Sequence, residues 1–130
     1  MENLEDNGFK AAPSAYFTGN AFFKIVVAAD ETTNCNISEV AFDKGCRNNW
    51  HTHPSNQILI VKEGLCLYQE EGKPIQQFKV GEAINFLPGI KHWHGASPEE
   101  PMIHFAINTN TEKGMVNWQE PVTDEQYHQQ

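Results

Sequence analysis

Basic side chains are scarce in this sequence. Its 130 residues carry 9 Lys and Arg against 17 Asp and Glu, for a formal net charge of −8. Nucleic acids and anionic membrane surfaces repel a chain with this excess of negative charge, because binding to either depends on clustered positive charge. We therefore expect neither of them as a partner.

Long hydrophobic runs are absent as well. No stretch approaches the roughly 20 apolar residues of a membrane-spanning helix. The first residues, Met1 to Asp6, are acidic and lack the apolar centre of a secretory signal. Cysteines are few and odd in number: Cys35, Cys46 and Cys66 form no C-x-x-C pair, which favours reduced thiols over a disulfide framework. These features together predict a cytoplasmic protein.

The sequence also lacks a long apolar period of 3.6 residues, an internal repeat and a low-complexity linker, which favours one domain without long helices. Short β-rich runs separated by Gly and Pro turns are present instead, and they predict an all-β sandwich or barrel. We expect residues 1–14 to form a partly disordered N-terminal arm and residues 15–130 to form the single domain. The expected strands span residues 22–28, 36–42, 57–61, 65–69, 75–78, 83–87 and 102–107.

Large apolar side chains of these runs are expected in the core, namely Phe22, Phe42, Leu59, Val61, Phe86 and Phe105. Phe22 and Phe23 are neighbours in one strand, so they point to opposite faces. One of them must therefore meet a second buried surface. The apolar run 22–27 could pair with a partner's sheet, and we expect a homodimer.

Histidines are the strongest functional signal, because five of the six lie between positions 51 and 104. In a strand, His51, His53 and Gln57 point to one face, and imidazole is the commonest metal ligand. Two surface loop histidines are the simpler interpretation. Gln57, however, leads into the aliphatic run 58–61, where an unpaired amide is costly, so it needs a partner. Further histidines, His92 and His94, follow the Pro88-Gly89 turn.

These segments resemble the two sequence motifs of the cupin superfamily. Gly45, His51, His53 and Gly64 match the first motif, and the segment from Gly81 to His92 resembles the second. There are two departures, since Gln57 replaces the usual Glu and Ala96 replaces the usual Asn. Residues 50–54, 91–96 and 122–127 are similar to one subgroup, which includes manganese-dependent hydroxynitrile lyases and cupins associated with carboxymuconolactone decarboxylases.

The resemblance covers the chain from about Ala15 onward and implies a double-stranded β-helix, a barrel related to the jelly roll. It also implies one divalent metal per chain, bound by His51, His53, Gln57 and His92. Manganese is the expected metal, and iron, nickel and zinc accept the same ligands. A neutral Gln57 leaves the site more positive than a Glu would, which strengthens its Lewis acidity.

Without a carboxylate ligand, a catalytic base must come from elsewhere, and His94 and His104 are the candidates. Two alternatives remain open: His104 as a core histidine bonded to backbone, and His94 as a fifth ligand. Trp50 and Trp93 are expected to pack in the core rather than to line a pocket. Residues 16–18 are expected to cover the pocket mouth.

The resemblance implies a small metal-dependent lyase that acts on a compact carbonyl or cyanohydrin-like substrate. A metal-dependent dioxygenase is the first alternative. A non-catalytic cupin that binds a small molecule, as a sensor or accessory protein, is the second. All three hypotheses require a small-molecule partner.

Overall fold

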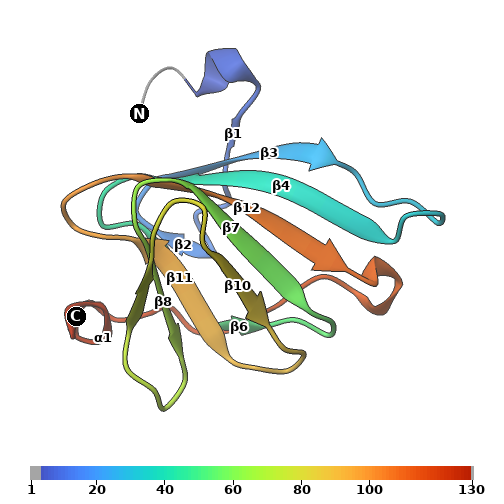
Figure 1. Ribbon diagram of the computed structural model, residues 1–130. Helices are drawn as coiled ribbons and strands as arrows, with labels where there is room; N and C mark the ends of the chain where they lie inside the picture. The colour runs from blue at the N-terminus through green and yellow to red at the C-terminus, as the bar shows by residue number, and fades with distance from the viewer. Residues whose placement is uncertain (1–3, 130) are drawn as a thin grey trace.

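The computed structural model describes residues 4–129 and consists of two antiparallel β-sheets that face each other (Figure 1). Strands make up 45% of the described residues and helices 8%, so the all-β prediction is confirmed. Within residues 4–129, no helix is long and apolar enough to cross a membrane.

The first sheet has the strand order β1-β3-β4-β12-β7-β10. Its members are β1 (Lys10–Ala11), β3 (Ala21–Val27), β4 (Cys35–Phe42), β12 (Met102–Thr109), β7 (Gln57–Glu63) and β10 (Ala83–Phe86). The second sheet runs β13-β6-β11-β5-β2, and β8 pairs with both β11 and β9. Its members are β13 (Asn117–Trp118), β6 (His51–Thr52), β11 (His92–Ala96), β5 (Arg47–Asn48), β2 (Phe17–Thr18), β8 (Cys66–Glu70) and β9 (Gln76–Phe78).

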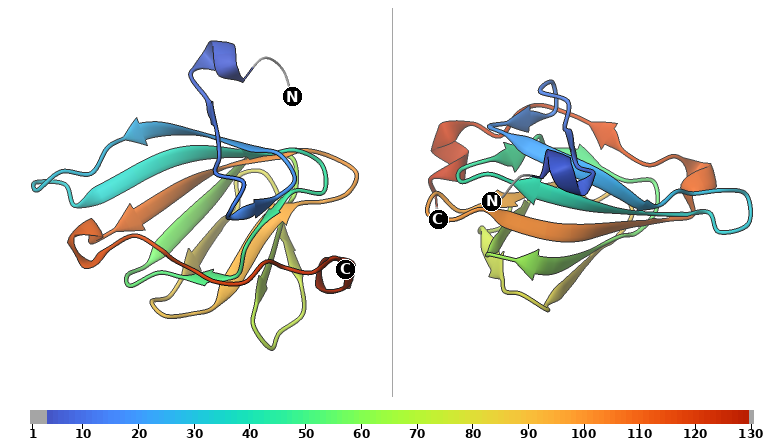
Figure 2. Two further views of the ribbon diagram at one scale, coloured as in Figure 1. Left: turned by 180° about the vertical axis from the view of Figure 1, so that it is seen from behind. Right: turned by 90° about the horizontal axis from the view of Figure 1, so that it is seen from above.

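Three short helical turns complete the fold: η1 (Glu5–Asn7), η2 (Thr111–Lys113) and α1 (Asp124–Tyr127). A capping box starts α1, in which the Thr123 and Gln126 side chains each bond to the other's backbone N–H. The C-terminal segment crosses the second sheet on its way to α1 (Figure 2, left). The sequence pattern predicted none of these turns.

All seven predicted strands are present, with ends that differ by two residues at most. The pairing register of β4, β12 and β7 aligns their inward-pointing side chains in rows across the first sheet. Val40, His104 and Val61 form one row, and Ser38, Ala106 and Leu59 form the next. Asn36, Asn108 and Gln57 form the third.

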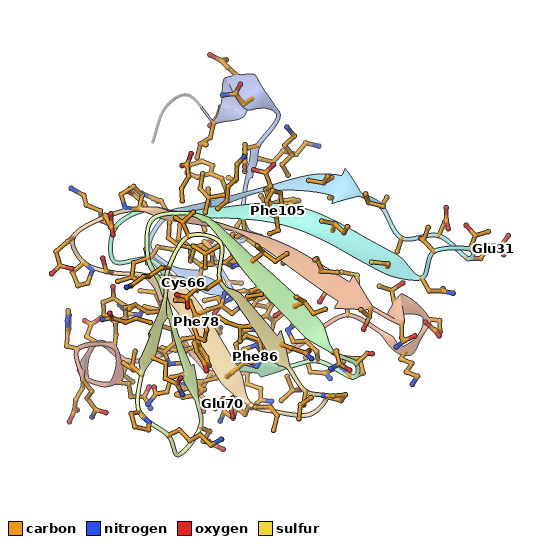
Figure 3. All side chains as sticks on the ribbon, in the orientation of Figure 1. Glu31, Cys66, Glu70, Phe78, Phe86 and Phe105 are labelled. Atoms are coloured by element: carbon orange, nitrogen blue, oxygen red, sulfur yellow. The ribbon has the colours of Figure 1, made fainter. Side chains whose placement is uncertain are left out.

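The main core lies between the sheets and contains Phe42, Leu59, Val61 and Phe86, as predicted. Phe105 was expected there as well, but this prediction is wrong. Strand alternation turns His104 and Ala106 inward, so Phe105 takes the outer face, half-buried, with Lys62 Nζ 5.7 Å from its ring centre. Figure 3 shows Phe78 and Phe86 together and Phe105 apart from them.

Phe22 and Phe23 point to opposite faces of β3, as the sequence predicts. Phe22 packs on the outer face of the sheet against a buried cluster of Phe9, Ala41 and Ile103. The N-terminal arm therefore supplies part of the second buried surface. Residues 1–3 of that arm lie outside the described residues, and its partial disorder remains a prediction.

Trp50 and Trp93 lie in a second core cluster with Leu67, Val122 and Tyr127. The packing interpretation of both tryptophans is confirmed. Successive side chains of a strand point to opposite faces, so each tryptophan points away from its histidine neighbours. This cluster therefore packs on the face of the second sheet opposite to the histidines.

Candidate functional site

Three histidines converge at the end of the second sheet. His51 on β6 pairs with His92 on β11, and His53 follows β6 directly. One ring nitrogen from each of the three lies within 4.8 Å of the others, and all three residues are buried. This group matches three of the four ligands that the sequence predicted, and it can hold a metal ion.

Backbone carbonyls fix the tautomer of each ring. His51 Nδ1 donates to Asn49 O at 2.7 Å, His92 Nδ1 donates to Ile90 O at 2.9 Å, and His53 Nδ1 donates to Met115 O. A carbonyl only accepts, so the proton must reside on Nδ1 and the lone pair on Nε2. The Nε2 atoms of His53 and His92 are buried and have no hydrogen-bond partner among the described residues.

Gln57 adds an oxygen to this set. Its Nε2 donates to Asn108 Oδ1 at 3.2 Å, which leaves Oε1 buried and without a partner in the described part of the chain. Unpaired buried polar atoms are costly, and here imidazole lone pairs and an amide oxygen are unpaired in one place. This donor set fits a divalent cation of the borderline type.

Burial keeps these histidines neutral. Loss of solvation is the largest cause of the lowered pKa of His51, His53 and His92, and it brings the pKa of His92 to about 3. For His51, the neighbouring rings of His92 and His53 lower the pKa further. All three are therefore unprotonated at neutral pH, the form in which imidazole binds metal.

His94 and His104 form a second buried pair next to this cluster. His104 Nε2 lies 3.1 Å from His94 Nδ1, and burial lowers both pKa values, that of His104 to about 4. His104 Nδ1 has no hydrogen-bond partner among residues 4–129. His104 lines the cavity beside the three-histidine group, and interactions with the backbone of Phe105 and of His104 itself raise its pKa in part against the effect of burial.

Asn48 on β5 holds His94 in place. Its Oδ1 accepts the His94 backbone N–H at 2.9 Å, and its Nδ2 lies 3.2 Å from the ring Nε2. No local sequence pattern marks Asn48, because its partner His94 lies 46 residues away. Gly95 follows His94, and a Cβ there would lie 2.5 Å from Cys46 O, so only glycine permits this approach of β11 to β5.

A cavity of about 180 Å³ opens onto both histidine groups. His51, His53, Gln57, His94 and His104 line it together with Asn36, Ser38, Asn48, Asn108 and the apolar side chains of Phe17, Phe23, Val40, Ala106, Met115, Val116 and Trp118. His92 is not among the residues that line the cavity.

Aromatic side chains from the N-terminal and C-terminal parts of the chain stack on one another beside the cavity. Tyr16 stacks on Trp118 with ring centres 4.8 Å apart, and Trp118 packs against His51 at the same distance. Of residues 16–18, only Phe17 is among the residues that line the cavity, and a role of this segment as its cover remains a prediction. No sequence pattern pointed to Trp118 or Met115 as parts of the site. Neither of the buried thiols is reactive, because burial raises the pKa of Cys46 and of Cys66 to about 12.

Comparison with known families supports this description. A family model described as a cupin domain matches residues 38–108. This chain belongs to the cupin family. The fold prediction of a double-stranded β-helix is thereby confirmed.

Two relatives are similar over most of their length. One curated relative is named (R)-mandelonitrile lyase, from Granulicella tundricola, and is 40% identical over 115 residues, or 88% of each chain. The crystal structure of a cupin-like protein from Thermotoga maritima is 41% identical, with a TM-score of 0.87 over 91% of this chain and 90% of that one.

A more distant structure shows the fold alone. An uncharacterised protein from Klebsiella pneumoniae, described as having a double-stranded β-helix domain, is 16% identical, with a TM-score of 0.67 over 92% of this chain and 96% of that one.

Proposed function

We propose that this cupin is a divalent-metal-dependent enzyme, a lyase that cleaves or forms a small cyanohydrin. The observation that carries the proposal is the cavity itself, where unpaired imidazole and amide donors lie beside a neutral histidine pair. The 40% identity with a protein named (R)-mandelonitrile lyase supports the choice of reaction.

The metal ligands in this proposal are His51, His53, Gln57 and His92. Manganese is the expected metal, with iron, nickel or zinc as alternatives, because such sites are selected by geometry and metal availability as much as by affinity. When bound, a divalent cation supplies Lewis acidity toward a substrate hydroxyl or carbonyl oxygen. All four ligands are neutral, so the chain itself does not reduce the charge of the cation.

The histidine pair supplies the proton transfer. A neutral imidazole of His94 or His104 takes the hydroxyl proton of the cyanohydrin, the C–CN bond breaks with its electron pair on cyanide, and the proton then passes to cyanide. The products are an aldehyde or ketone and hydrogen cyanide. The apolar wall of Phe23, Val40 and Trp118 limits the water that competes for that proton.

The test is cyanohydrin cleavage by manganese-loaded protein, with metal-stripped protein as the control. We expect turnover of mandelonitrile that depends on metal and not on oxygen. Oxygen uptake by iron-loaded protein would instead favour a dioxygenase. Tight binding of a carbonyl compound without turnover would favour a non-catalytic binding protein.

We also propose a homodimer formed through β3. The side chains of Ile25, Val26 and Val27 are 54%, 48% and 38% exposed, and β1 pairs only with Phe22 and Phe23 of this strand. The rest of this edge of β3 is open to a second copy. Light scattering should give twice the chain mass of 14.7 kDa, and Ile25→Lys should shift it toward the monomer. A monomer at all micromolar concentrations contradicts the proposal.

We further propose a cytoplasmic location, supported by three free cysteines, Cys35, Cys46 and Cys66. We also propose that residues 15–130 are sufficient for the metal site, because all the ligands lie within them. A chain that begins at Ala15 and still binds one equivalent of manganese would support this boundary. Failure of that chain to bind manganese, when the whole chain does, would contradict it.

A further inference from the structure

Three amide side chains form a row across the sheet beside the metal cluster. Asn36 on β4 pairs directly with Asn108 on β12, and Asn108 pairs with Gln57 on β7. All three line the cavity. Only Gln57 belongs to the predicted metal ligands, and Asn108 orients it through one hydrogen bond. The Nδ2 groups of Asn36 and Asn108 have no role in the proposed chemistry.

In the structure, the side-chain oxygens of both asparagines accept hydrogen bonds. Ser38 Oγ donates to Asn36 Oδ1 at 3.1 Å, and Gln57 Nε2 donates to Asn108 Oδ1 at 3.2 Å. The Oδ1 atom of each asparagine therefore already accepts a hydrogen bond. The Nδ2 groups of both have no partner among the described residues, so two N–H₂ donors face the same cavity.

We propose that Asn36 and Asn108 form a donor pair that binds an acceptor oxygen at the distal end of the substrate. The inference rests on the proposed function, in that a small molecule occupies this cavity. Asn36 is two strand spacings from Gln57, about 10 Å across the sheet. A substrate that spans this distance has its reacting carbon near the histidines and a second polar group near the amides.

The lining defines the chemistry of that substrate. Apolar side chains, among them Phe23, Val40 and Ala106, lie near the two polar ends, and they favour an apolar middle such as an aromatic ring. No Lys or Arg is found among the described residues that line the cavity. The distal group is therefore a neutral acceptor, such as a ketone or an ether, and not a carboxylate.

Two shape-matched ligands test the donor pair, namely 4-acetylbenzyl alcohol and 4-isopropylbenzyl alcohol. They differ in whether the distal group accepts a hydrogen bond. Calorimetric titration of the manganese-loaded protein should show about tenfold tighter binding of the acetyl compound, which is the scale of one or two net hydrogen bonds. Binding is measured rather than turnover, so the result does not depend on the reaction.

The matched variants are Asn36→Asp and Asn108→Asp. Aspartate keeps the oxygen that accepts from Ser38 or Gln57, but it replaces the free donor with an acceptor. Each change should abolish the preference for the acetyl compound, and elemental analysis should show an unchanged metal content. Asn85→Asp is the control, because Asn85 Oδ1 accepts from Asn56 outside the cavity, and it should leave the preference intact.

The outcomes separate the two proposals. Equal binding of both compounds, or a preference that survives in both cavity variants, would overturn the donor pair alone. An acetyl preference in a protein that does not cleave cyanohydrins would support the donor pair and contradict the lyase proposal. Failure of both compounds to bind at millimolar concentration would overturn the donor pair, whereas the lyase proposal is decided by the cleavage of cyanohydrins.

Discussion

His104 Nε2 and His94 Nδ1 lie 3.1 Å apart, and both rings are buried. Burial keeps both neutral, because it lowers both pKa values, and the second ring lowers that of His94 further. In a hydrogen bond between two neutral imidazoles, one ring donates and the other accepts. A proton taken by one ring therefore changes the acid–base state of the other, and the two act as one unit.

This coupling predicts a non-additive loss of activity. His94→Ala and His104→Ala should each lower kcat for cyanohydrin cleavage about a hundredfold, the usual scale for loss of a general base. The double variant should be little worse than either single variant, because removal of one ring already disables the pair. If the loss of kcat in the double variant equalled the product of the two single losses, the rings would act independently.

Metal content must be measured in the same proteins. His104→Ala should retain a full equivalent of metal, because His104 lies outside the three-histidine group. Loss of metal from His94→Ala would identify His94 as a fifth ligand. Full activity in both variants would mean that neither ring is the base.

The metal site itself is tested by His53→Ala. This change removes a buried Nε2 that has no hydrogen-bond partner among the described residues, so manganese affinity should fall by at least about tenfold. Elemental analysis after dialysis gives the readout, and the exposed His128→Ala provides the control with one histidine fewer. A full equivalent of tightly bound metal in His53→Ala would contradict the assignment.

Acid should destabilise the metal-free protein. Its buried histidines have folded-state pKa values below the ordinary 6.5, so the unfolded chain binds more protons once the pH falls below about 6.5. The free energy of unfolding should decrease from there down to about 4 for His104 and about 3 for His92. Each histidine contributes a slope of up to about 1.4 kcal/mol per pH unit.

Urea unfolding at several pH values measures this slope. His104→Ala has one buried histidine fewer, so its stability should depend less steeply on pH by about one proton. A stability that is flat between about pH 6.5 and pH 4 would show that these rings remain solvated.

Gln57→Glu tests the neutral ligand set. The added negative charge should leave manganese bound. It should shift the pH–rate profile to higher pH, because it reduces the positive charge of the site. A carboxylate cannot donate to Asn108 Oδ1, so the Asn108 amide should rotate and offer its Nδ2 instead. The preference for the acetyl ligand should weaken at the same time. An unchanged pH–rate profile would place residue 57 out of reach of the metal.

The C-terminal segment should contribute measurably to stability. Tyr127 donates its hydroxyl to Ala96 O, next to Gly95 on β11, and Arg47 bonds to Val122 O at 2.9 Å. Tyr127→Phe should cost about 1–2 kcal/mol, because it leaves a buried carbonyl unpaired. Asp124→Ala should have a smaller effect than Tyr127→Phe, since the Asp124 side chain is 84% exposed and its ion pair with Arg47 is screened by solvent. Chemical unfolding compares the two, and equal effects would contradict the structural role of Tyr127.

The sequence predicted those parts of the fold that alternate locally. Gln57 to Val61 has a strong aliphatic pattern, and His92 and His94 share a face because they are two residues apart. Asn36 and Asn108 were missed because their partnership depends on the register of β4 and β12. Phe105 was misplaced for a related reason, since an apolar run does not reveal which alternate residues face inward.

The sequence placed His51, His53 and Gln57 on one face of a single strand, and this was wrong, because His51 lies on β6 of the second sheet and Gln57 begins β7 of the first. No sequence pattern marked the short strands β5 and β6 as they are in the structure. Each has two residues, and they form through pairing with β11, β2 and β13, which lie far away in the sequence. Arg47 is buried, although arginine usually lies at the surface, because Val122 and Asp124 satisfy its guanidinium.

The C-terminal segment also bears on the order of folding. Trp50 exchanges backbone hydrogen bonds with Gln119 and Glu120, and Met115 O holds the His53 ring. These contacts close loops of more than 60 residues, whereas hairpins such as β8–β9 close over a short turn. Contacts with such sequence separation form slowly, so the aliphatic core can collapse before the histidine rings are locked. We therefore expect a newly made chain to form its core before its site, so that docking of the C-terminal segment sets the time at which the three histidines can first hold a metal ion.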